Sequence, residues 1–338
     1  LEYYIGEGAK PNNIYRLILA YLLWSETEYK KFEEFQGIKV ADIITKLKKG
    51  TVPTKAFEHS IPDWLVETLE KELGENWEKE MIALNEQAPT ILRANSLKTS
   101  TKHLIEELKH ENVESFQVPG FENAVQLEEK KNVFLTSAFK DGLFEVQDAG
   151  SQKIGEFLDV KPGMRVVDAC AGAGGKTLHL AALMENKGQI IAMDIHGWKL
   201  AELKRRAKRA GAHNIETREI TDNKVIKRLH EKADRLLIDA PCSGLGVLKR
   251  NPDSKWKIDQ DFIDRIRKEQ ETILQDYSKI IKKGGKMVYA TCSILPSENN
   301  EQVENFLKNN PDFKLVKEEK VMPSTGFDGF YMALIERV

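Results

Sequence analysis

The stretch RVVDACAGAGGKT, residues 165–177, decides how the second half of this chain folds. A short apolar run ends at Asp168 and leads into a turn with three glycines. The helical pattern TLHLAALME then follows at residues 177–185. A strand, a glycine-rich turn and a helix in this order predict the first unit of a parallel sheet whose two faces are covered by helices.

Further units of the same kind follow toward the C-terminus. Strand patterns occur at residues 189–194, 215–220, 235–240 and 286–292. Helical patterns occur at 198–210, stopped by Gly211, and within 260–282, ended by Gly284 and Gly285. A last helix is expected after a cap at Ser297, and residues 330–338 are expected to form a terminal antiparallel edge strand. The order predicts a doubly wound α/β sheet over residues 147–338.

The first 146 residues show different sequence patterns. Residues 1–84 are predicted to be helical, with Asn13 and Ser60 as helix caps and Gly74 as a stop. Residues 85–146 mix strand patterns such as ILRANSL with the capped helix pattern TSTKHLIEELKHEN, which indicates a small α/β domain. We therefore expect three parts, with boundaries after residues 84 and 146.

Three kinds of nucleotide-like ligand compete for the glycine turn. A phosphate-binding Walker A loop needs glycine at position 170, which is Cys170, and a dinucleotide fingerprint needs glycine or alanine at position 177, which is Thr177. What remains is an acid at a strand end followed by Gly-x-Gly-Gly, the way an S-adenosylmethionine site begins. The turn, Cys170, Ala171, Gly172, Ala173, Gly174, Gly175 and Lys176, is therefore predicted to bind S-adenosyl-L-methionine. A tight turn that binds no ligand is the alternative.

Two more acids strengthen this prediction. Asp194 ends the next strand, 20 residues after Gly174, where a carboxylate can accept both hydrogen bonds of a ribose diol. Asp222 lies just beyond the third strand, where it can reach the adenine amino group.

Two cysteines are expected to meet at the same edge of the sheet. One strand pattern leads into Asp239-Ala-Pro-Cys242 and the next into Thr291-Cys292, and the carboxyl ends of parallel strands face one crevice. A single cysteine at a strand end is usually a small apolar residue, which is how we interpret Cys170. A pair indicates covalent chemistry, because a thiolate that adds to C6 of cytosine makes C5 able to attack a methyl group. Such a thiol needs positive surroundings, which Lys176 can supply.

The motifs DACAGAGGKT, DAPCSGLGVLKRNPDSKW, YATCSILPSEN and GFDGFYMA resemble the NOL/NOP/Sun family of RNA cytosine-C5 methyltransferases. They resemble most closely its bacterial Sun/Fmu (RsmB) branch, which acts on 16S ribosomal RNA. The resemblance covers residues 60–338, and the paired DAPCSG and TCS motifs are specific to the family. Gly172-Ala173 stands where many relatives have Ala-Pro, and residues 1–84 look like a shortened NusB-like domain.

This resemblance implies a Rossmann-like class I methyltransferase domain, preceded by an RRM-like RNA-binding subdomain. It also implies roles for single residues: Cys292 attacks C6, Cys242 helps to break the adduct, Asp239 contacts the cytosine and the cofactor, and Lys176 holds cofactor or base. Arg93 and Asn95 resemble the Arg-x-Asn element of the family's RNA-binding subdomain.

Other RNA contacts are expected in two basic segments. Lys249 and Arg250 follow the DAPCSG motif directly and are predicted to bind RNA. Residues 204–209 carry five basic side chains, which at helical spacing cannot all point one way, so a solvated surface is the favoured interpretation there. The target cytosine is expected to be single-stranded or flipped out.

The composition sets limits on these predictions. Charged residues make up 31% of the chain and hydrophobic residues 41%, while the net charge is −2, so RNA must bind to a local basic face. Three cysteines without zinc spacing indicate no metal and a reducing cytoplasm, and no membrane span is expected. We expect a monomeric cytoplasmic enzyme that methylates rRNA. The alternatives are the same chemistry on tRNA, a small-molecule or protein methyltransferase on the same fold, or a non-catalytic RNA-binding assembly factor.

Overall fold

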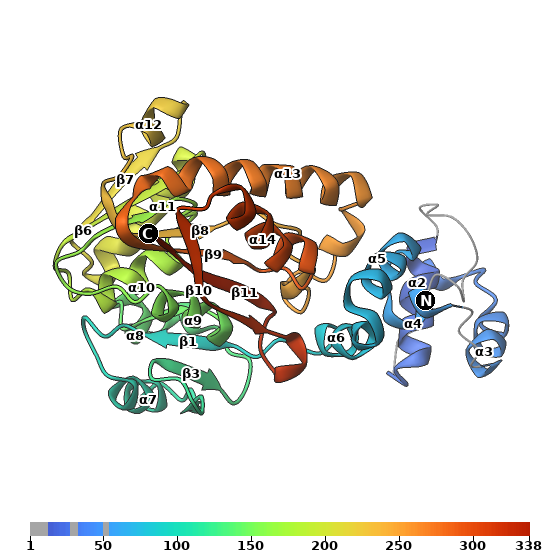
Figure 1. The fold of residues 1–338 in the computed structure, drawn as a ribbon. Helices are drawn as coiled ribbons and strands as arrows, with labels where there is room; N and C mark the ends of the chain where they lie inside the picture. The colour runs from blue at the N-terminus through green and yellow to red at the C-terminus, as the bar shows by residue number, and fades with distance from the viewer. Residues whose placement is uncertain (1–12, 28–32, 50–53) are drawn as a thin grey trace. The chain divides into compact units, whose positions relative to one another are not determined.

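The computed structural model describes residues 13–27, 33–49 and 54–338 (Figure 1). The chain divides into two compact units, residues 1–66 and 67–338. The first unit is helical in its described part, with α2 (Asn13–Trp24), α3 (Val40–Lys49) and α4 (Lys55–His59). Leu19, Ala20 and Ile43 are buried together in its core. Helix α5 (Asp63–Leu73) begins in this unit and ends in the second.

In the second unit, the end of α5 is followed by α6 (Trp77–Leu84) and a small antiparallel sheet. Its strands β1 (Ile91–Ala94), β2 (Ser115–Gln117), β3 (Ala124–Leu127) and β4 (Phe144–Val146) lie in the order β2-β3-β1-β4. Helices α7 (Thr101–His110) and α8 (Ser137–Lys140) complete this small domain. Ser100 begins α7 by accepting a hydrogen bond from the backbone of His103, as its capping pattern predicts.

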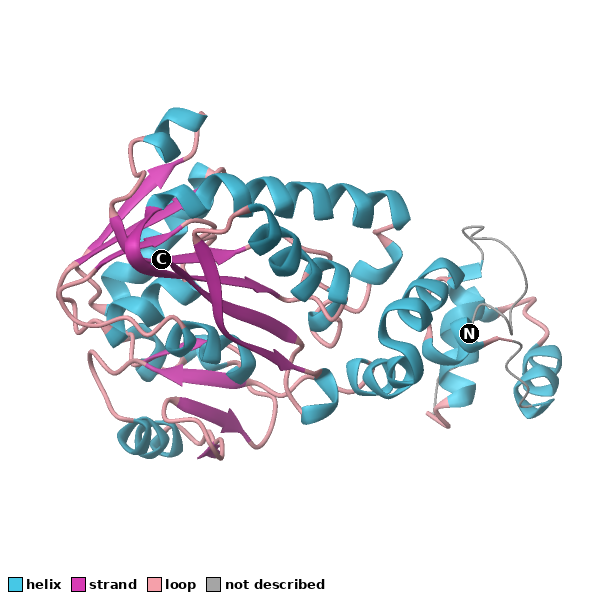
Figure 2. Cartoon of the chain, viewed as in Figure 1, coloured by secondary structure: helices cyan, strands magenta, loops and turns pink. Residues whose placement is uncertain are grey.

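A seven-stranded sheet forms the centre of the second unit (Figure 2). Its strands lie in the order β10-β11-β9-β8-β5-β6-β7, and only β11 is antiparallel to both of its neighbours. The bounds are β5 (Arg165–Asp168), β6 (Gln189–Asp194), β7 (Ile215–Glu219), β8 (Ala233–Asp239), β9 (Ile281–Thr291), β10 (Phe313–Val321) and β11 (Phe330–Arg337). The predicted doubly wound α/β fold with a small α/β domain before it is confirmed.

Helices cover both faces of this sheet because neighbouring apolar residues on each strand point to opposite faces. Val166 packs with helices α9 (Ala149–Phe157), α10 (Gly175–Leu183) and α11 (Gly197–Ala210). Val167, one residue later, packs with α12 (Asn223–Lys227), α13 (Gln260–Tyr277) and α14 (Asn300–Asn309). The result is a three-layer sandwich, visible in Figure 1 with α13 and α14 on one side of the sheet and α10 on the other.

Three local predictions were wrong. β11 is not an edge strand, because β10 pairs with its outer side. Strand β10 was not predicted, because most of its side chains are exposed and charged. Gly284 and Gly285 do not end a helix but lie inside β9, where four residues of β9 (282–285) stand opposite one residue of β8, Asp234. Ser297 does not cap α14, which follows Asn299; its hydroxyl donates to the carboxylate of Glu72 instead.

No helix in the described ranges is both long and apolar enough to cross a membrane.

Candidate active site

The glycine turn lies where the order of the strands reverses. β5 is followed along the chain by β6 and β7 on one side, while β8 and β9 lie on its other side. The carboxyl ends of β5 and β8 are therefore the place where such sheets bind ligands. Gly174 has a φ of +89°, and a Cβ there would lie 2.5 Å from Leu203, so only glycine fits this close turn against α11.

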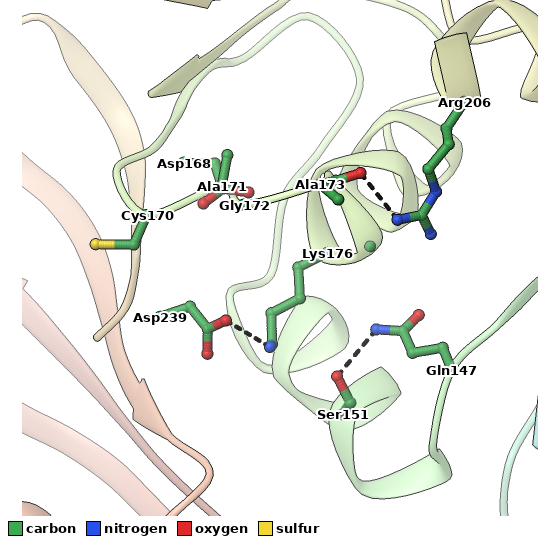
Figure 3. A pocket seen from close by; sticks show the side chains of 11 residues that line it. Gln147, Ser151, Asp168, Cys170, Ala171, Gly172, Ala173, Lys176, Arg206 and Asp239 are labelled. Atoms are coloured by element: carbon green, nitrogen blue, oxygen red, sulfur yellow. Dashed lines mark hydrogen bonds and ion pairs between the residues drawn. The ribbon is translucent and has the colours of Figure 1, made fainter. Parts of the chain in front are cut away.

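A pocket of about 300 Å³ opens at this point (Figure 3). Its volume is at the lower end of the range for small-molecule sites. The lining residues come from the turn, from β8 and from two neighbouring helices: Gln147, Ser151, Asp168, Cys170, Ala171, Gly172, Ala173, Gly175, Lys176, Arg206 and Asp239. Most members of the predicted cofactor segment are thus brought together in one pocket.

Asp168 carries an unused hydrogen-bond acceptor in this pocket. Its Oδ2 accepts a hydrogen bond from Thr177 Oγ1 at 2.7 Å, whereas its Oδ1 is buried without a partner. Burial, and to a smaller degree the nearby Asp239, raises the pKa of Asp168 to about 7. A buried, unpaired carboxylate oxygen of this kind suits a cationic ligand group.

Lys176 and Asp239 form an ion pair across the pocket. Lys176 Nζ lies 2.7 Å from Asp239 Oδ2, and Figure 3 shows the two side chains pointing toward each other. Burial alone would lower the pKa of Lys176, but the charge of Asp239 and the hydrogen bond to it raise it overall. The interaction with Cys292 raises it further.

The two cysteines of the paired motifs are in direct contact. Cys242 Sγ and Cys292 Sγ lie 3.3 Å apart, just beyond the ends of β8 and β9. The contact with Cys292 and then burial raise the pKa of Cys242 well above its ordinary value. Cys242 is therefore a thiol rather than a thiolate at neutral pH.

The third cysteine lies in the pocket wall. Burial raises the pKa of Cys170 well above its ordinary value, and the surrounding acids, Asp168 first, add to this effect. Its thiol is thus unreactive, which agrees with its interpretation as a small packing residue.

Asp194 and Asp222 do not line this pocket. The carboxylate of Asp194 accepts hydrogen bonds from the backbone of Gly172 and His196, at 2.9 and 2.8 Å, and so ties the turn to the end of β6. Asp222 is exposed and caps α12 by accepting from the backbone of Lys224. Their predicted contacts with ribose and adenine remain predictions.

Arg93 and Asn95 are buried in the seam between the small domain and the sheet. The Arg93 guanidinium donates to the carbonyl of Gly175 at 2.8 Å, and Asn95 Nδ2 donates to the carbonyls of Gly142 and Ala210, both at 2.8 Å. Neither side chain offers a surface to RNA in this conformation. Both join the small domain to the cofactor turn and to α11.

The basic side chains after the DAPCSG motif are partly engaged inside the protein. Arg250 lies between two buried carboxylates, Asp148 at 3.0 Å and Asp328. Lys249 donates to the carbonyl of Pro323 at 3.3 Å and is only half-buried. Lys249 is therefore the one of the two whose charge has no carboxylate partner among the described residues.

The basic helix α11 presents its charges in two directions, as the helical spacing predicts. Lys204, Arg205 and Lys208 are exposed. Arg206 and Arg209 turn inward and bind the buried Glu145 of β4, and Arg206 also donates to the carbonyl of Ala173 at 2.9 Å.

Four residues that line the pocket were not predicted as members of the site. Asp168 was recognised only as the acid that opens the turn, and Arg206 only as part of a basic helix. Gln147 comes directly before Asp148, which caps α9, and Ser151 lies in the first turn of that helix. The sequence signal that could have pointed to both was the capping pattern shortly before strand β5. Among the described residues, no group of three or more potential metal ligands occurs.

Comparison with known proteins agrees with this geometry. Residues 156–335 match the family described as "16S rRNA methyltransferase RsmB/F", and residues 61–134 match the ferredoxin-like domain described for RsmF/B-like methyltransferases. A solved "Methyltransferase Homolog Protein" from Pyrococcus horikoshii is 26% identical; it covers 85% of this chain and 100% of its own, with a TM-score of 0.75.

Curated relatives match most of this chain. The "Ribosomal RNA small subunit methyltransferase B" of Proteus mirabilis is 33% identical over 82% of this chain and 65% of its own length. The protein of the same name from Yersinia enterocolitica is 35% identical over 82% of this chain and 66% of its own. This chain spans about three fifths of the length of several such relatives. Because the family pattern matches 180 of 338 residues (156–335), the chain belongs to the 16S rRNA methyltransferase RsmB/F family.

Proposed function

We propose that this chain transfers a methyl group from S-adenosyl-L-methionine to C5 of a cytosine in RNA, through a covalent bond between Cys292 and C6. The observation that carries the proposal is the contact of the two cysteine sulfurs, 3.3 Å apart, beside the Lys176–Asp239 ion pair. A methyltransferase that acts on a nitrogen or oxygen lone pair needs no such pair of thiols.

The pocket fits the cofactor. When bound, S-adenosyl-L-methionine supplies an electrophilic methyl group on a sulfonium. The free Oδ1 of Asp168 suits the ammonium of its amino-acid part, and the small residues of the turn let the backbone come close to it. We propose Asp168, Gly172 and Lys176 as principal contacts, with Asp194 and Asp222 toward the ribose and adenine.

Cys292 is the proposed nucleophile. Its thiolate adds to C6 of the cytosine, and the ring electrons that this addition releases make C5 nucleophilic enough to take the methyl group. Lys176, whose ammonium interacts with Cys292, is the proposed source of the positive surroundings that such a nucleophile needs. Asp239 stands beside Lys176, in a position suited to a contact with the polar edge of the cytosine.

Cys242 is the proposed partner for breaking the adduct. After methyl transfer, a base removes the proton from C5 and the Cys292–C6 bond breaks, which restores the aromatic ring and frees the Cys292 thiolate. The raised pKa of Cys242 keeps it protonated at neutral pH, so it is poorly suited to be the first nucleophile. Its contact with the Cys292 sulfur suits a role in this last step.

Substitution of the two cysteines tests this division of roles. Cys292→Ala should abolish both methyl transfer and adduct formation. Cys242→Ala should transfer the methyl group and then stall, leaving an RNA–protein complex that survives denaturing electrophoresis. The double variant should leave none, and mass spectrometry of the crosslinked peptide should find cytidine on Cys292. Cytidine on Cys242 would reverse the assignment.

The relatives' names indicate ribosomal RNA of the small subunit as the substrate. We infer the same substrate class for this chain. Bisulfite sequencing of ribosomal and transfer RNA, from cells with and without the gene, should reveal a cytosine in 16S rRNA that loses its protection when the gene is absent. Loss of protection only in transfer RNA would assign the enzyme to that substrate instead.

A further inference from the structure

A buried carboxylate lies directly behind the two cysteines. Glu298 belongs to the turn Pro296–Glu298 between β9 and α14, and it is 0% exposed. No salt bridge in the described part of the chain involves this side chain. Its contacts are instead hydrogen bonds, and three of them come from the two loops that carry the cysteines.

Each cysteine is followed by a serine that binds this carboxylate. Ser243, next to Cys242, donates its backbone N–H to Glu298 Oε1 at 2.8 Å and its hydroxyl to Oε2 at 2.5 Å. Ser293, next to Cys292, donates its hydroxyl to the same Oε2. One oxygen atom therefore joins the residues that follow the two sulfurs.

Two further side chains hold this arrangement. Gln270 of α13 donates from Nε2 to Glu298 Oε1 at 3.1 Å and to the carbonyl of Pro241 at 2.9 Å. Asn299 donates to the carbonyl of Ser293 at 2.9 Å. Every group bonded to the Glu298 carboxylate can donate a hydrogen bond to it.

The sheet alone does not fix the distance between the sulfurs. After Cys242, the backbone of Gly246 donates to the carbonyl of Cys292 at 2.9 Å. The pairing of β8 with β9 itself ends earlier, at Asp239 and Ala290, followed by one hydrogen bond from the backbone of Ala240 to the carbonyl of Ala290. Cys242 and Cys292 lie beyond this point, on two separate loops. The residues that bind Glu298, Ser243 and Ser293, come directly after these two cysteines.

We propose that Glu298 is a positioning residue that holds the Cys242 and Cys292 thiols together by bridging Ser243 and Ser293. This inference rests on the proposed function for its catalytic meaning, but the spacing of the thiols can be measured without any methyl transfer. Glu298→Gln keeps the size of the side chain and replaces one acceptor oxygen with a donor, so the present set of four hydrogen bonds, all donated to the carboxylate, cannot be kept.

Phenylarsine oxide tests the spacing, because its arsenic binds two thiols only when they lie close together. Intact-mass analysis should show one arsenical bound to the wild type. In Glu298→Gln the apparent affinity for the arsenical should fall by about tenfold or more. Glu301→Gln, an exposed carboxylate on α14, is the matched control and should behave as the wild type.

Kinetics give the second measurement. Glu298→Gln should lower kcat for RNA methylation by about 100-fold, as expected for a misplacement of reacting groups by about 1 Å, with KM for RNA and cofactor unchanged. If this variant fails to fold, Ser293→Ala removes a single bridge and should show smaller losses in both measurements.

The outcomes are distinguishable. Unchanged arsenical binding in a folded Glu298→Gln, or in Ser293→Ala where Glu298→Gln does not fold, would overturn the positioning role whatever happens to kcat. Weakened arsenical binding together with a wild type that methylates no RNA would leave the positioning role standing and overturn the proposed function.

Discussion

At the scale of single residues, two aspartates of the site, Asp168 and Asp239, differ in their surroundings. Asp168 and Asp239 end neighbouring strands, but only Asp239 has a cation beside it, at 2.7 Å. Asp168 has a hydroxyl donor and one empty oxygen, so burial raises its pKa to about 7. Without a ligand, Asp168 is therefore about half protonated at neutral pH.

This difference predicts that cofactor binding is coupled to proton release. Below pH 7 Asp168 carries a proton, and an ammonium group should bind the ionised form, so binding displaces that proton. The affinity for S-adenosylhomocysteine should fall by about tenfold per pH unit below pH 7 and level off above it. Calorimetry in buffers with different ionisation enthalpies measures the released proton directly.

Asp168→Asn provides the control for this prediction, since it removes the titrating group and should flatten the pH profile. A profile that stays equally steep in this variant would assign the titration to another group.

At the scale of elements, the small domain is joined to the cofactor turn by buried polar contacts. Glu145 of β4 binds Arg206 and Arg209 of α11, and Arg206 holds the carbonyl of Ala173 in the turn. Arg93 of β1 reaches the carbonyl of Gly175 in the same way. Movement of the small domain on RNA is therefore expected to reach the cofactor site through these side chains.

Replacement of Glu145 should show how much these contacts contribute to stability and to cofactor binding. Glu145→Ala leaves two largely buried guanidinium groups without their carboxylate, which should lower the free energy of unfolding by about 3–5 kcal/mol. Loss of the anchor for Arg206 should also weaken S-adenosylhomocysteine binding by about tenfold. Denaturant unfolding and calorimetry measure the two effects.

Glu216→Ala is the comparison, because Glu216 pairs with Arg218 on an exposed part of β7. An exposed pair is worth less than about 1 kcal/mol. Equal losses in the two variants would mean that Glu145 contributes no more than a surface charge.

The same elements show what the sequence could and could not predict. The strand and turn at residues 165–177, the paired acids and the two cysteines are local patterns, and the parallel topology brings them to one edge. β10 could not be recognised, because an exposed edge strand rich in charge lacks the alternation of a half-buried one. The positions of Arg93, Asn95 and Arg206 were also not predicted, since a polar side chain gives no local sign that it will be buried against another domain.

At the scale of the whole molecule, the net charge of −2 does not attract RNA. Fifty-one basic residues are balanced by 53 acidic ones, and several inward-facing cations are already paired. Arg250 is held by Asp148 and Asp328, and the pKa of Asp328 is nevertheless raised to about 6, mainly by burial. Arg250→Ala would therefore disturb the fold as well as the surface charge.

Lys249 gives a cleaner test of the RNA-binding surface, because its ammonium contacts only a carbonyl among the described residues. If it neutralises one phosphate, Lys249→Ala should weaken RNA binding and reduce the slope of log Kd against log salt by about one unit. Affinity for S-adenosylhomocysteine should not change. Lys257→Ala is the matched control, since Lys257 is exposed on the same loop but paired with Asp253. Equal reductions in slope for both variants would indicate a diffuse surface effect, and no change in either would place the RNA path elsewhere on the protein.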